Sequence, residues 1–496
     1  MSDPSGWTYD AVVVGAGPNG LVAANHLLDA GWSVLVLEAQ PDVGGAVRSA
    51  PDVHPDFVHD TYSSFYPLAQ ASPVIGHLGL DRQHPGDGAA WLDLCERWDA
   101  IGDHLVGALM SPFPPVRSGL GVLARLRKAG GLDLARLLLT PAADIGRTYF
   151  GGRGPGLLLC GNGGHADIPL DATGSGLLAV LMTMLGQTVG FPVPEGGAGE
   201  LARALARRAE SLGGVIRTST RVTGIDVRDG RATAVRTEDG DRVPVGRAVL
   251  ADVVAPRLYG DLVAEEDLPA HVRRGMSRFQ LDPGTVKVDW ALDGRVPWGS
   301  PPEVAPGTVH VADSAEQIAE ASGQVSAGTI PATPFLLVGQ MSVADPTRSP
   351  GGTEALWAYT HVPQRVVRDA GDDGLRGTWD ESERERFADR MQARIERLAP
   401  GFGSRIRARR VLGPRELEAR DANLVGGAIN GGTSALHQQL VFRPVPGAGR
   451  AETGIGGLYL ASASAHPGGG VHGAPGMNAA RAALAHDRTR RLLRRT

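Results

Sequence analysis

The stretch VVVGAGPNGLVAANHL, residues 12–27, decides the fold of this chain. It places Gly15, Gly17 and Gly20 within six positions, directly after a run of valines. Residues 9–14 (YDAVVV) predict a buried strand, and residues 18–31 predict a helix that ends at Gly31. The next apolar run, WSVLVLEA at residues 32–39, predicts a second buried strand. Together these segments predict a βαβ unit.

The spacing of the glycines predicts a dinucleotide site on this unit. Gly15 permits a tight turn, Gly17 lets the backbone approach a pyrophosphate, and Gly20 lets the helix pack closely on the sheet. The helix N-terminus, with Pro18 and Asn19, offers free N–H groups to the anion. Glu38, eighteen residues after the third glycine, is placed to accept hydrogen bonds from ribose hydroxyls. The alternative is a glycine-rich turn with no ligand, and the motif alone does not separate NAD from FAD.

A second glycine pair, in EAQPDVGGAVRS at residues 38–49, follows at once. Arg48 in it is placed either to meet a phosphate or to order the loop. At these residues the chain resembles the FAD-dependent, glutathione-reductase-type proteins of the amine oxidase and phytoene desaturase superfamily. The resemblance implies FAD, with Glu38 on the adenosine ribose, Arg48 near the pyrophosphate and the backbone of Val222 at the adenine.

The C-terminal part sharpens the resemblance. Residues 423–447 (NLVGGAINGGTSALHQQLVFRPVPG) and 457–484 (GLYLASASAHPGGGVHGAPGMNAARAAL) resemble the phytoene desaturase-related branch with retinol saturases, carotenoid ketolases and pyridine nucleotide-disulfide oxidoreductase domain-2 proteins. In that branch the glycine-rich segment lies along the flavin ring, which implies that the helix beginning near Gly476 points its positive end at the flavin. The alternative is a glycine-rich strand-to-helix turn used only for packing. Asn430, His437 and Gln438 depart from the pattern of the branch, which leaves the substrate open. The cofactor-binding residues expected in all are Gly15, Gly17, Pro18, Asn19, Gly20, Glu38, Ala39, Gly44, Gly45, Ala46, Arg48, Val222, Gly468, Gly469, Gly470, Val471 and Gly473.

Three side chains are candidates for catalysis. His466 and His472 flank the glycine triplet, where each is either a proton acceptor at the flavin edge or a structural residue. Lys287, in TVKVDWAL, resembles in position the lysine of flavin amine oxidases, and the alternative is a lysine that only extends from its strand toward the surface. No metal site is expected, because the two cysteines, Cys95 and Cys160, form no CxxC pair.

The resemblance implies that the chain desaturates a hydrophobic, carotenoid- or isoprenoid-like substrate by hydride transfer to flavin N5. The chain contains no convincing second dinucleotide motif, which favours oxygen or a quinone as electron acceptor. The alternatives are an oxidase of a compact natural-product intermediate acting on a C–N or C–C bond, a flavin-dependent polyene isomerase, and a flavin-binding interaction protein without turnover.

The βαβ unit predicts an α/β fold, and the resemblance implies a glutathione-reductase-type FAD-binding Rossmann domain with an inserted, mixed α+β substrate domain. The expected FAD domain comprises residues 1–75, 195–255 and 411–496, and the substrate domain residues 76–194 and 256–410.

A net charge of −5 gives no reason to expect nucleic acid as a partner. The N-terminus has no signal-peptide pattern, and no apolar run reaches the ~18 residues of a membrane span, so we expect a cytoplasmic protein. Residues 110–140 combine leucines with five cationic residues, and predict either peripheral contact with a membrane or a solvated helical cap.

Overall fold

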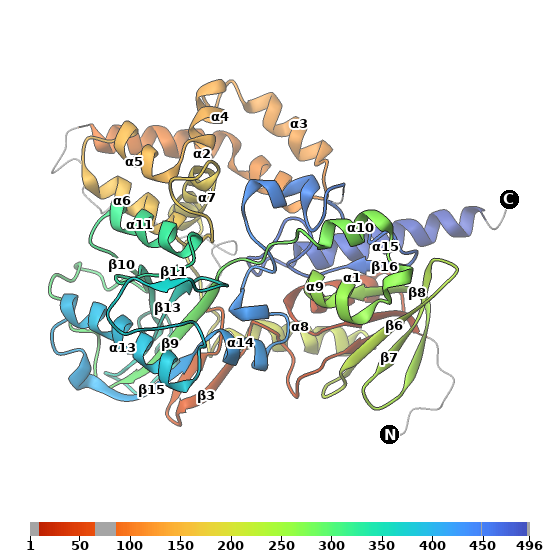
Figure 1. The fold of residues 1–496 in the computed structure, drawn as a ribbon. Helices are drawn as coiled ribbons and strands as arrows, with labels where there is room; N and C mark the ends of the chain where they lie inside the picture. The colour runs from red at the N-terminus through yellow and green to blue at the C-terminus, as the bar shows by residue number, and fades with distance from the viewer. Residues whose placement is uncertain (1–8, 65–85, 448, 494–496) are drawn as a thin grey trace.

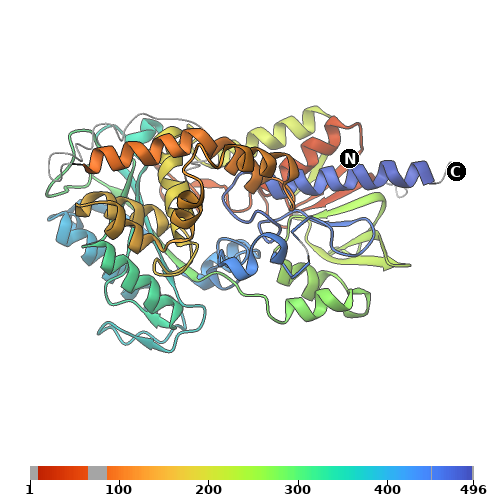
Figure 2. The same ribbon diagram turned by 90° about the horizontal axis from the view of Figure 1, so that it is seen from above.

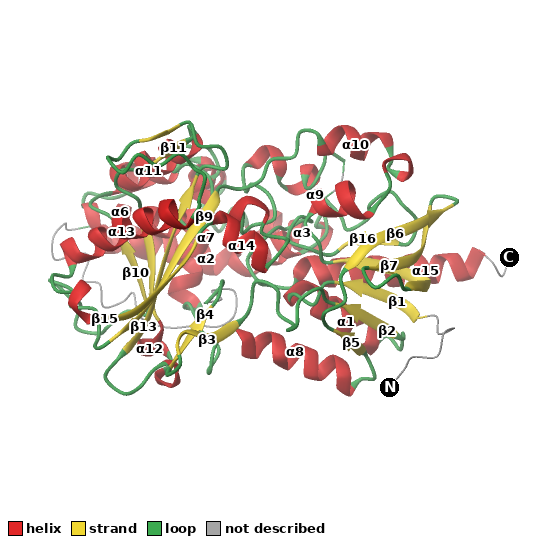
Figure 3. Cartoon of the chain, turned by 60° about the horizontal axis from the view of Figure 1, so that its bottom comes forward, coloured by secondary structure: helices red, strands yellow, loops and turns green. Residues whose placement is uncertain are grey.

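The computed structural model describes residues 9–64, 86–447 and 449–493. The predicted domain boundary near residue 75 lies outside these residues. Of the four sheets in the described residues, the two larger ones lie at opposite ends of the molecule, and helices pack around and between them (Figures 1 and 3).

The first sheet contains the predicted βαβ unit. Its strand order is β5-β2-β1-β8-β7-β6, and β16 also pairs with β8. The pairs β1–β2, β1–β8, β2–β5 and β16–β8 are parallel, whereas β6, β7 and β8 form an antiparallel meander. Its strands are β1 (Tyr9–Val14), β2 (Val34–Leu37), β5 (Val215–Arg217), β6 (Val222–Arg228), β7 (Arg231–Thr237), β8 (Arg242–Ala251) and β16 (Leu458–Leu460).

Side chains alternate between the two faces of this sheet, as the period of a strand requires. Ala11 and Val13 of β1 face the helices α1 (Pro18–Asp29), α8 (Gly199–Ser211) and α15 (Ala474–Leu493). Val12 and Val14 face a second core with β6, β7, α9 (Ala255–Arg257) and α10 (Ala270–Met276). Both faces are therefore covered, which explains why the central strand is a continuous apolar run.

The second sheet is antiparallel, with the order β10-β12-β13-β9-β15. Every residue of β9, the strand between β13 and β15, is buried. Val286, Val288 and Trp290 pack on α13, whereas the opposite face packs on α11 and on the hairpin of β3 and β4. The strands of this sheet are β9 (Gly284–Leu292), β10 (Thr308–Val311), β12 (Leu336–Gln340), β13 (Glu354–Val362) and β15 (Ile406–Leu412). Two separate strand pairs are β3 (Ser49–His54) with β4 (Phe57–Asp60), and β11 (Thr329–Ile330) with β14 (Arg368–Asp369). The helices of this part are α11 (Ala315–Ser326), α12 (Met341–Ala344), α13 (Glu381–Leu398) and α14 (Pro414–Arg420).

A layer of helices covers one end of the second sheet (Figure 1). It comprises α2 (Asp87–Met110), α3 (Val116–Arg125), α4 (Leu132–Leu139), α5 (Ala142–Tyr149), α6 (Arg153–Gly163) and α7 (Ser175–Thr188). Trp91, Leu134, Leu159 and Met184 belong to one shared core of this layer. Within the described residues, no helix combines the length and the apolar character needed to cross a bilayer. The α/β class predicted from the sequence is confirmed.

Candidate functional site

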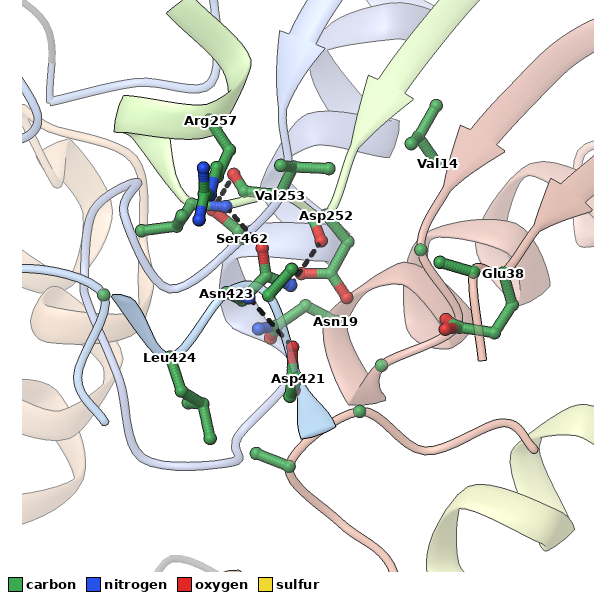
Figure 4. Close-up of a pocket in the computed structure, with 18 of the residues that line it drawn as sticks. Val14, Asn19, Glu38, Asp252, Val253, Arg257, Asp421, Asn423, Leu424 and Ser462 are labelled. Atoms are coloured by element: carbon green, nitrogen blue, oxygen red, sulfur yellow. Dashed lines mark hydrogen bonds between the residues drawn. The ribbon is translucent and has the colours of Figure 1, made fainter. Parts of the chain in front are cut away.

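A cavity of about 510 Å³ lies where β1, β2 and β8 end, at the carboxyl edge of the parallel strands (Figure 4). This is the position at which open α/β sheets bind their ligands. Nine of the predicted cofactor-binding residues line it: Gly15, Gly17, Pro18, Asn19, Glu38, Ala39, Gly45, Ala46 and Val222. The cavity thus joins the first strand and helix, the end of β2 and the start of β6.

The glycine turn is held by close backbone contacts. Gly15 has a φ of +96°, and its N–H donates to the carbonyl of Leu37 over 2.8 Å. A Cβ on Gly20 would lie 2.3 Å from the carbonyl oxygen of Gly15, and one on Gly17 would lie 2.8 Å from Asp252 Oδ2. Side chains at these positions would fill the cradle at the start of α1, so the turn requires glycine.

Glu38 fastens this turn to the end of β2. Its Oε2 accepts the N–H of Ala16 at 2.7 Å, and its Oε1 accepts the N–H of Gln40 at 2.8 Å. Burial raises the pKa of the Glu38 carboxyl, although these two hydrogen bonds oppose the shift. Each carboxylate oxygen can accept a second hydrogen bond, and Glu38 lines the cavity, so acceptor capacity remains for ribose hydroxyls.

Three further carboxyl groups line the cavity, those of Asp252, Asp261 and Asp421, and none of them was predicted as a site residue. Asp252 directly follows β8, and its Oδ2 accepts the N–H of Gly20 at 2.8 Å. Burial raises the pKa of Asp252 to about 7, and the neighbouring carboxylates of Asp421 and Glu38 add to the shift. Burial likewise raises the pKa of Asp421. The one signal in the sequence for Asp252 was its position directly after a strand that pairs in parallel with β1.

Asn423 joins the far wall of the cavity to the end of β8 (Figure 4). Its Oδ1 accepts the N–H of Val254 at 2.8 Å, its Nδ2 donates to the carbonyl of Asp252 at 3.3 Å, and its own N–H donates to Asp421. Ser462 also donates to the carbonyl of Val253 at 2.8 Å. These contacts bring residues from three distant parts of the chain onto one wall.

The loop at residues 429–433 forms another part of this wall, through Ile429 and Gly431. Buried Asp282 accepts the N–H groups of Ile429, Asn430 and Gly432. Arg443, also buried, donates to carbonyls of this loop, including those of Asn430 and Thr433, and to that of Ala463. Arg443 therefore holds the loop in place through its guanidinium group.

The residues present fit a dinucleotide. The N-termini of α1 and α15 meet beside the cavity, since a Cβ on Gly476 would lie 1.9 Å from the carbonyl oxygen of Asn19. Asn19 lines the cavity, and its buried Oδ1 has no hydrogen-bond partner among the described residues. Two helix N-termini supply N–H groups and positive potential, which suits a pyrophosphate.

The other predicted cofactor residues lie outside this lining: Gly20, Gly44, Arg48, Gly468, Gly469, Gly470, Val471 and Gly473. Arg48 donates to Tyr62 Oη at 2.8 Å and to the carbonyl of Arg420 at 3.2 Å, so it orders the loop. Val471 has a φ of +52°, which is strained for a β-branched residue and typical of functional segments. Helix α15 begins at Ala474, two residues before the predicted start.

The three candidate catalytic residues also lie outside the lining. His466 Nε2 donates to the carbonyl of Ser111 at 3.0 Å, and burial lowers the pKa of this histidine. His472 Nδ1 accepts the N–H of Ala474 at 3.1 Å, and burial lowers its pKa to about 4. Both imidazoles are therefore neutral near pH 7.

Lys287 lies on the face of β9 that meets the β3–β4 hairpin. Its Nζ donates to the carbonyl of Asp60 at 2.8 Å and forms an ion pair with buried Asp289. Asp289 also accepts from Arg410 at 2.8 Å. Burial lowers the pKa of Lys287, and Asp289 opposes the shift. The ammonium is thus part of a buried ion-pair network in the second sheet, and a catalytic role for it stays a prediction.

Comparisons with known proteins agree with this geometry. Residues 19–255 match the model of the family described as flavin containing amine oxidoreductase. The chain is 28% identical to pyridine nucleotide-disulfide oxidoreductase domain-containing protein 2 of Mus musculus, over 95% of this chain and 92% of the relative. It is 27% identical to a phytoene dehydrogenase of Streptomyces griseus, over 82% of this chain and 83% of that protein. A solved structure of putrescine oxidase shares the fold, with a TM-score of 0.59 at 16% identity, covering 97% of this chain and 99% of the other.

Proposed function

We propose that this FAD-dependent oxidoreductase, whose residues 19–255 match the flavin containing amine oxidoreductase family, desaturates a hydrophobic, isoprenoid-like substrate. The family and the cofactor predicted from the sequence are both confirmed. The finer statement, about the substrate and the bond, is the proposal.

The observation that carries the proposal is the similarity to the phytoene dehydrogenase, which extends over more than four fifths of both chains. Such a reaction removes two hydrogens from adjacent carbons and needs no polar handle on the substrate. When bound, FAD supplies the two-electron chemistry by taking up a hydride from a C–H bond.

His466 is the residue we propose to take up the second hydrogen, as a proton. Because Nε2 carries the proton that is donated to Ser111, Nδ1 is the basic nitrogen of the neutral ring. This Nδ1 is buried and has no hydrogen-bond partner among the described residues. Its lowered pKa keeps it unprotonated near pH 7, as a proton acceptor must be.

We propose that the electrons then pass to oxygen or a quinone. The glycines at residues 196–199 imitate a second dinucleotide motif, but the residues before them, 190–195, form no strand. The supply of a nicotinamide through a second Rossmann unit therefore has no support in the described residues.

The test is anaerobic reduction of the FAD-loaded protein. We expect the flavin absorbance to bleach with a C40 polyene presented in detergent, and the product to lose two hydrogens by mass spectrometry. Bleaching with putrescine but not with the polyene would overturn the substrate class. A polyene rearranged at constant mass would indicate an isomerase, and no bleaching with either substrate would indicate a protein without turnover.

The matched variant is His466→Gln, which keeps the hydrogen bond to Ser111 within reach of its amide. We expect it to retain FAD and to slow bleaching by about 10²-fold or more, the usual contribution of a proton acceptor. The variant should lower kcat, and its rate should no longer depend on pH as that of the wild type does. If His466 were purely structural, the variant would instead lose flavin or stability. Bleaching at the wild-type rate would exclude His466 as the acceptor.

A further inference from the structure

Helices α3 and α4 expose an unusual number of large apolar side chains at one end of the molecule. Val116, Leu120 and Leu123 of α3 are 64%, 62% and 68% exposed, and Leu132 and Leu139 of α4 are 84% and 57% exposed. The three on α3 are spaced four and three residues apart and share one face of the helix. No residue of α3 is fully buried. We call the outward faces of these two helices, with the loop between them, the α3–α4 surface.

The apolar side chains of this surface are interspersed with unpaired cations. Arg117 and Arg125 on α3, Arg127 and Lys128 in the loop, and Arg136 on α4 are all exposed. Within the part of the chain that the structure describes, none of the five forms an ion pair, and Asp133 is the one acidic residue between Val116 and Leu139.

The arginines of α13 behave differently, which makes the arrangement on α3 and α4 specific. Arg390 pairs with Asp369, and both Arg394 and Arg397 pair with Asp313. The chain as a whole has a net charge of −5. With five cations against Asp133 alone, the α3–α4 surface is strongly positive, and the remainder of the molecule is more acidic than the total indicates.

The position of the surface leaves it open to a large partner. Helix α3 packs on α2, and α4 packs on α7, so that their other faces point away from the body of the protein. Both lie at the end of the helical layer in Figure 1, and the orange and gold helices are unobscured when the molecule is seen from above in Figure 2.

We propose that the α3–α4 surface docks the protein on an anionic lipid bilayer. Leucines that insert at the level of the headgroups bury apolar area, and cations beside them pair with lipid phosphates. In a two-fold dimer this surface would face its own copy and the unpaired cations would repel one another, whereas lipid phosphates neutralise them, which favours the bilayer as partner. The inference goes beyond the proposed oxidoreductase function and does not depend on the substrate.

Hydrogen bonds join the start of the α3–α4 surface to the C-terminal segment that is predicted to lie along the flavin. The carbonyls of Met110 and Ser111, at the end of α2 just before α3, accept hydrogen bonds from Asn478 and His466. A bilayer at α3 would thus lie beside the elements that hold the predicted reaction centre, an arrangement that suits uptake of an apolar molecule from lipid.

The test is co-flotation of the FAD-loaded full chain with vesicles of phosphatidylcholine, either pure or with one third phosphatidylglycerol. We expect binding to the anionic vesicles, release at high salt, and little binding to the neutral ones. Leu120→Glu with Leu123→Glu should weaken binding at least tenfold. Arg125→Gln with Arg127→Gln should weaken it by about 25-fold, since each cation near such a surface contributes about fivefold.

The matched control is Val304→Glu with Val367→Glu, because these valines are 75% and 73% exposed but lie outside the surface. This variant should bind as the wild type does, and all variants should keep the wild-type flavin spectrum. Equal binding to neutral vesicles, no binding to anionic ones, or unchanged binding of the leucine variant would overturn the proposal. A lipid-free dimer that the leucine variant converts to monomer would also overturn it, and would assign the surface to a second copy.

Discussion

Asp252 offers a sharp test of the electrostatics of the cavity. Its carboxyl is buried beside the start of α1, where it accepts the Gly20 N–H, with Glu38 and Asp421 close enough to raise its pKa further. Raising the pKa from 3.8 to about 7 corresponds to a penalty of about 4 kcal/mol on the ionised folded state. Asparagine is the neutral counterpart of this side chain and has nearly the same shape, so the variant to make is Asp252→Asn.

The sign follows from proton linkage. Because the folded state binds this proton more tightly than the unfolded state, the penalty is absent below pH 3.8, grows as the pH rises toward about 7, and is constant above that. Asparagine carries no charge at any pH, and its Oδ1 still accepts from Gly20. Relative to wild type, the free energy of unfolding of Asp252→Asn should therefore rise by about 2–3 kcal/mol between about pH 5 and about pH 8.

The assay is urea unfolding of flavin-free protein at several pH values. Any fixed cost of burying the amide shifts the difference equally at every pH, so only the slope reports the charge. Asp372→Asn, at an exposed position, is the control and should show no slope. A difference between variant and wild type that is the same at all pH values would refute the reasoning.

Three further changes test the site and its scaffold. Glu38→Arg places a cation beside the two backbone N–H groups that Glu38 now accepts and where the ribose is expected, so the flavin-to-protein absorbance ratio should fall at least about tenfold. The control, Glu210→Arg at an exposed position, should keep its flavin. Full retention of flavin by Glu38→Arg would rule out the ribose assignment. Lys287→Met leaves buried Asp289 with Arg410 as its one remaining ion-pair partner. The change should lower the free energy of unfolding by about 3–5 kcal/mol in urea titrations. Lys128→Met, at an exposed position, should lower it by less than about 0.5 kcal/mol. Gly20→Ala forces a Cβ against the Gly15 carbonyl and should lower the free energy of unfolding by at least about 3 kcal/mol. Gly323→Ala, in open space on α11, should raise it by about 0.5–1 kcal/mol. Equal effects of the two changes would show that the turn at Gly20 has room for a side chain.

Much of the FAD-binding end could be predicted because it depends on local pattern. The valine run, the three glycines and the helix that follows correspond to β1, the turn and α1, which ends at Asp29, just before the predicted stop. GTVKVDWAL was predicted as a strand and is β9, residues Gly284–Leu292. These patterns need only neighbours along the chain, since strand and helix periods are properties of short segments.

The roles of single polar residues were less predictable, because their partners come from far along the chain. Lys287 meets Asp60, more than two hundred residues away, and Arg48 meets the backbone of Arg420. Asp421 and Asn423 reach the cavity only because the chain returns after the second sheet. Spacing in the sequence contains no information on such meetings.

The sequence by itself determined the βαβ unit, the dinucleotide cradle and, through its resemblance to a family, the flavin. Only the tertiary structure decided that four carboxyl groups line the cavity, that Lys287 is engaged in a buried ion-pair network, and that the leucines of α3 point outward. The physical reason is that backbone conformation follows from local sterics and hydrogen bonding, whereas pKa, ion pairing and exposure depend on which distant groups the fold brings within a few ångströms.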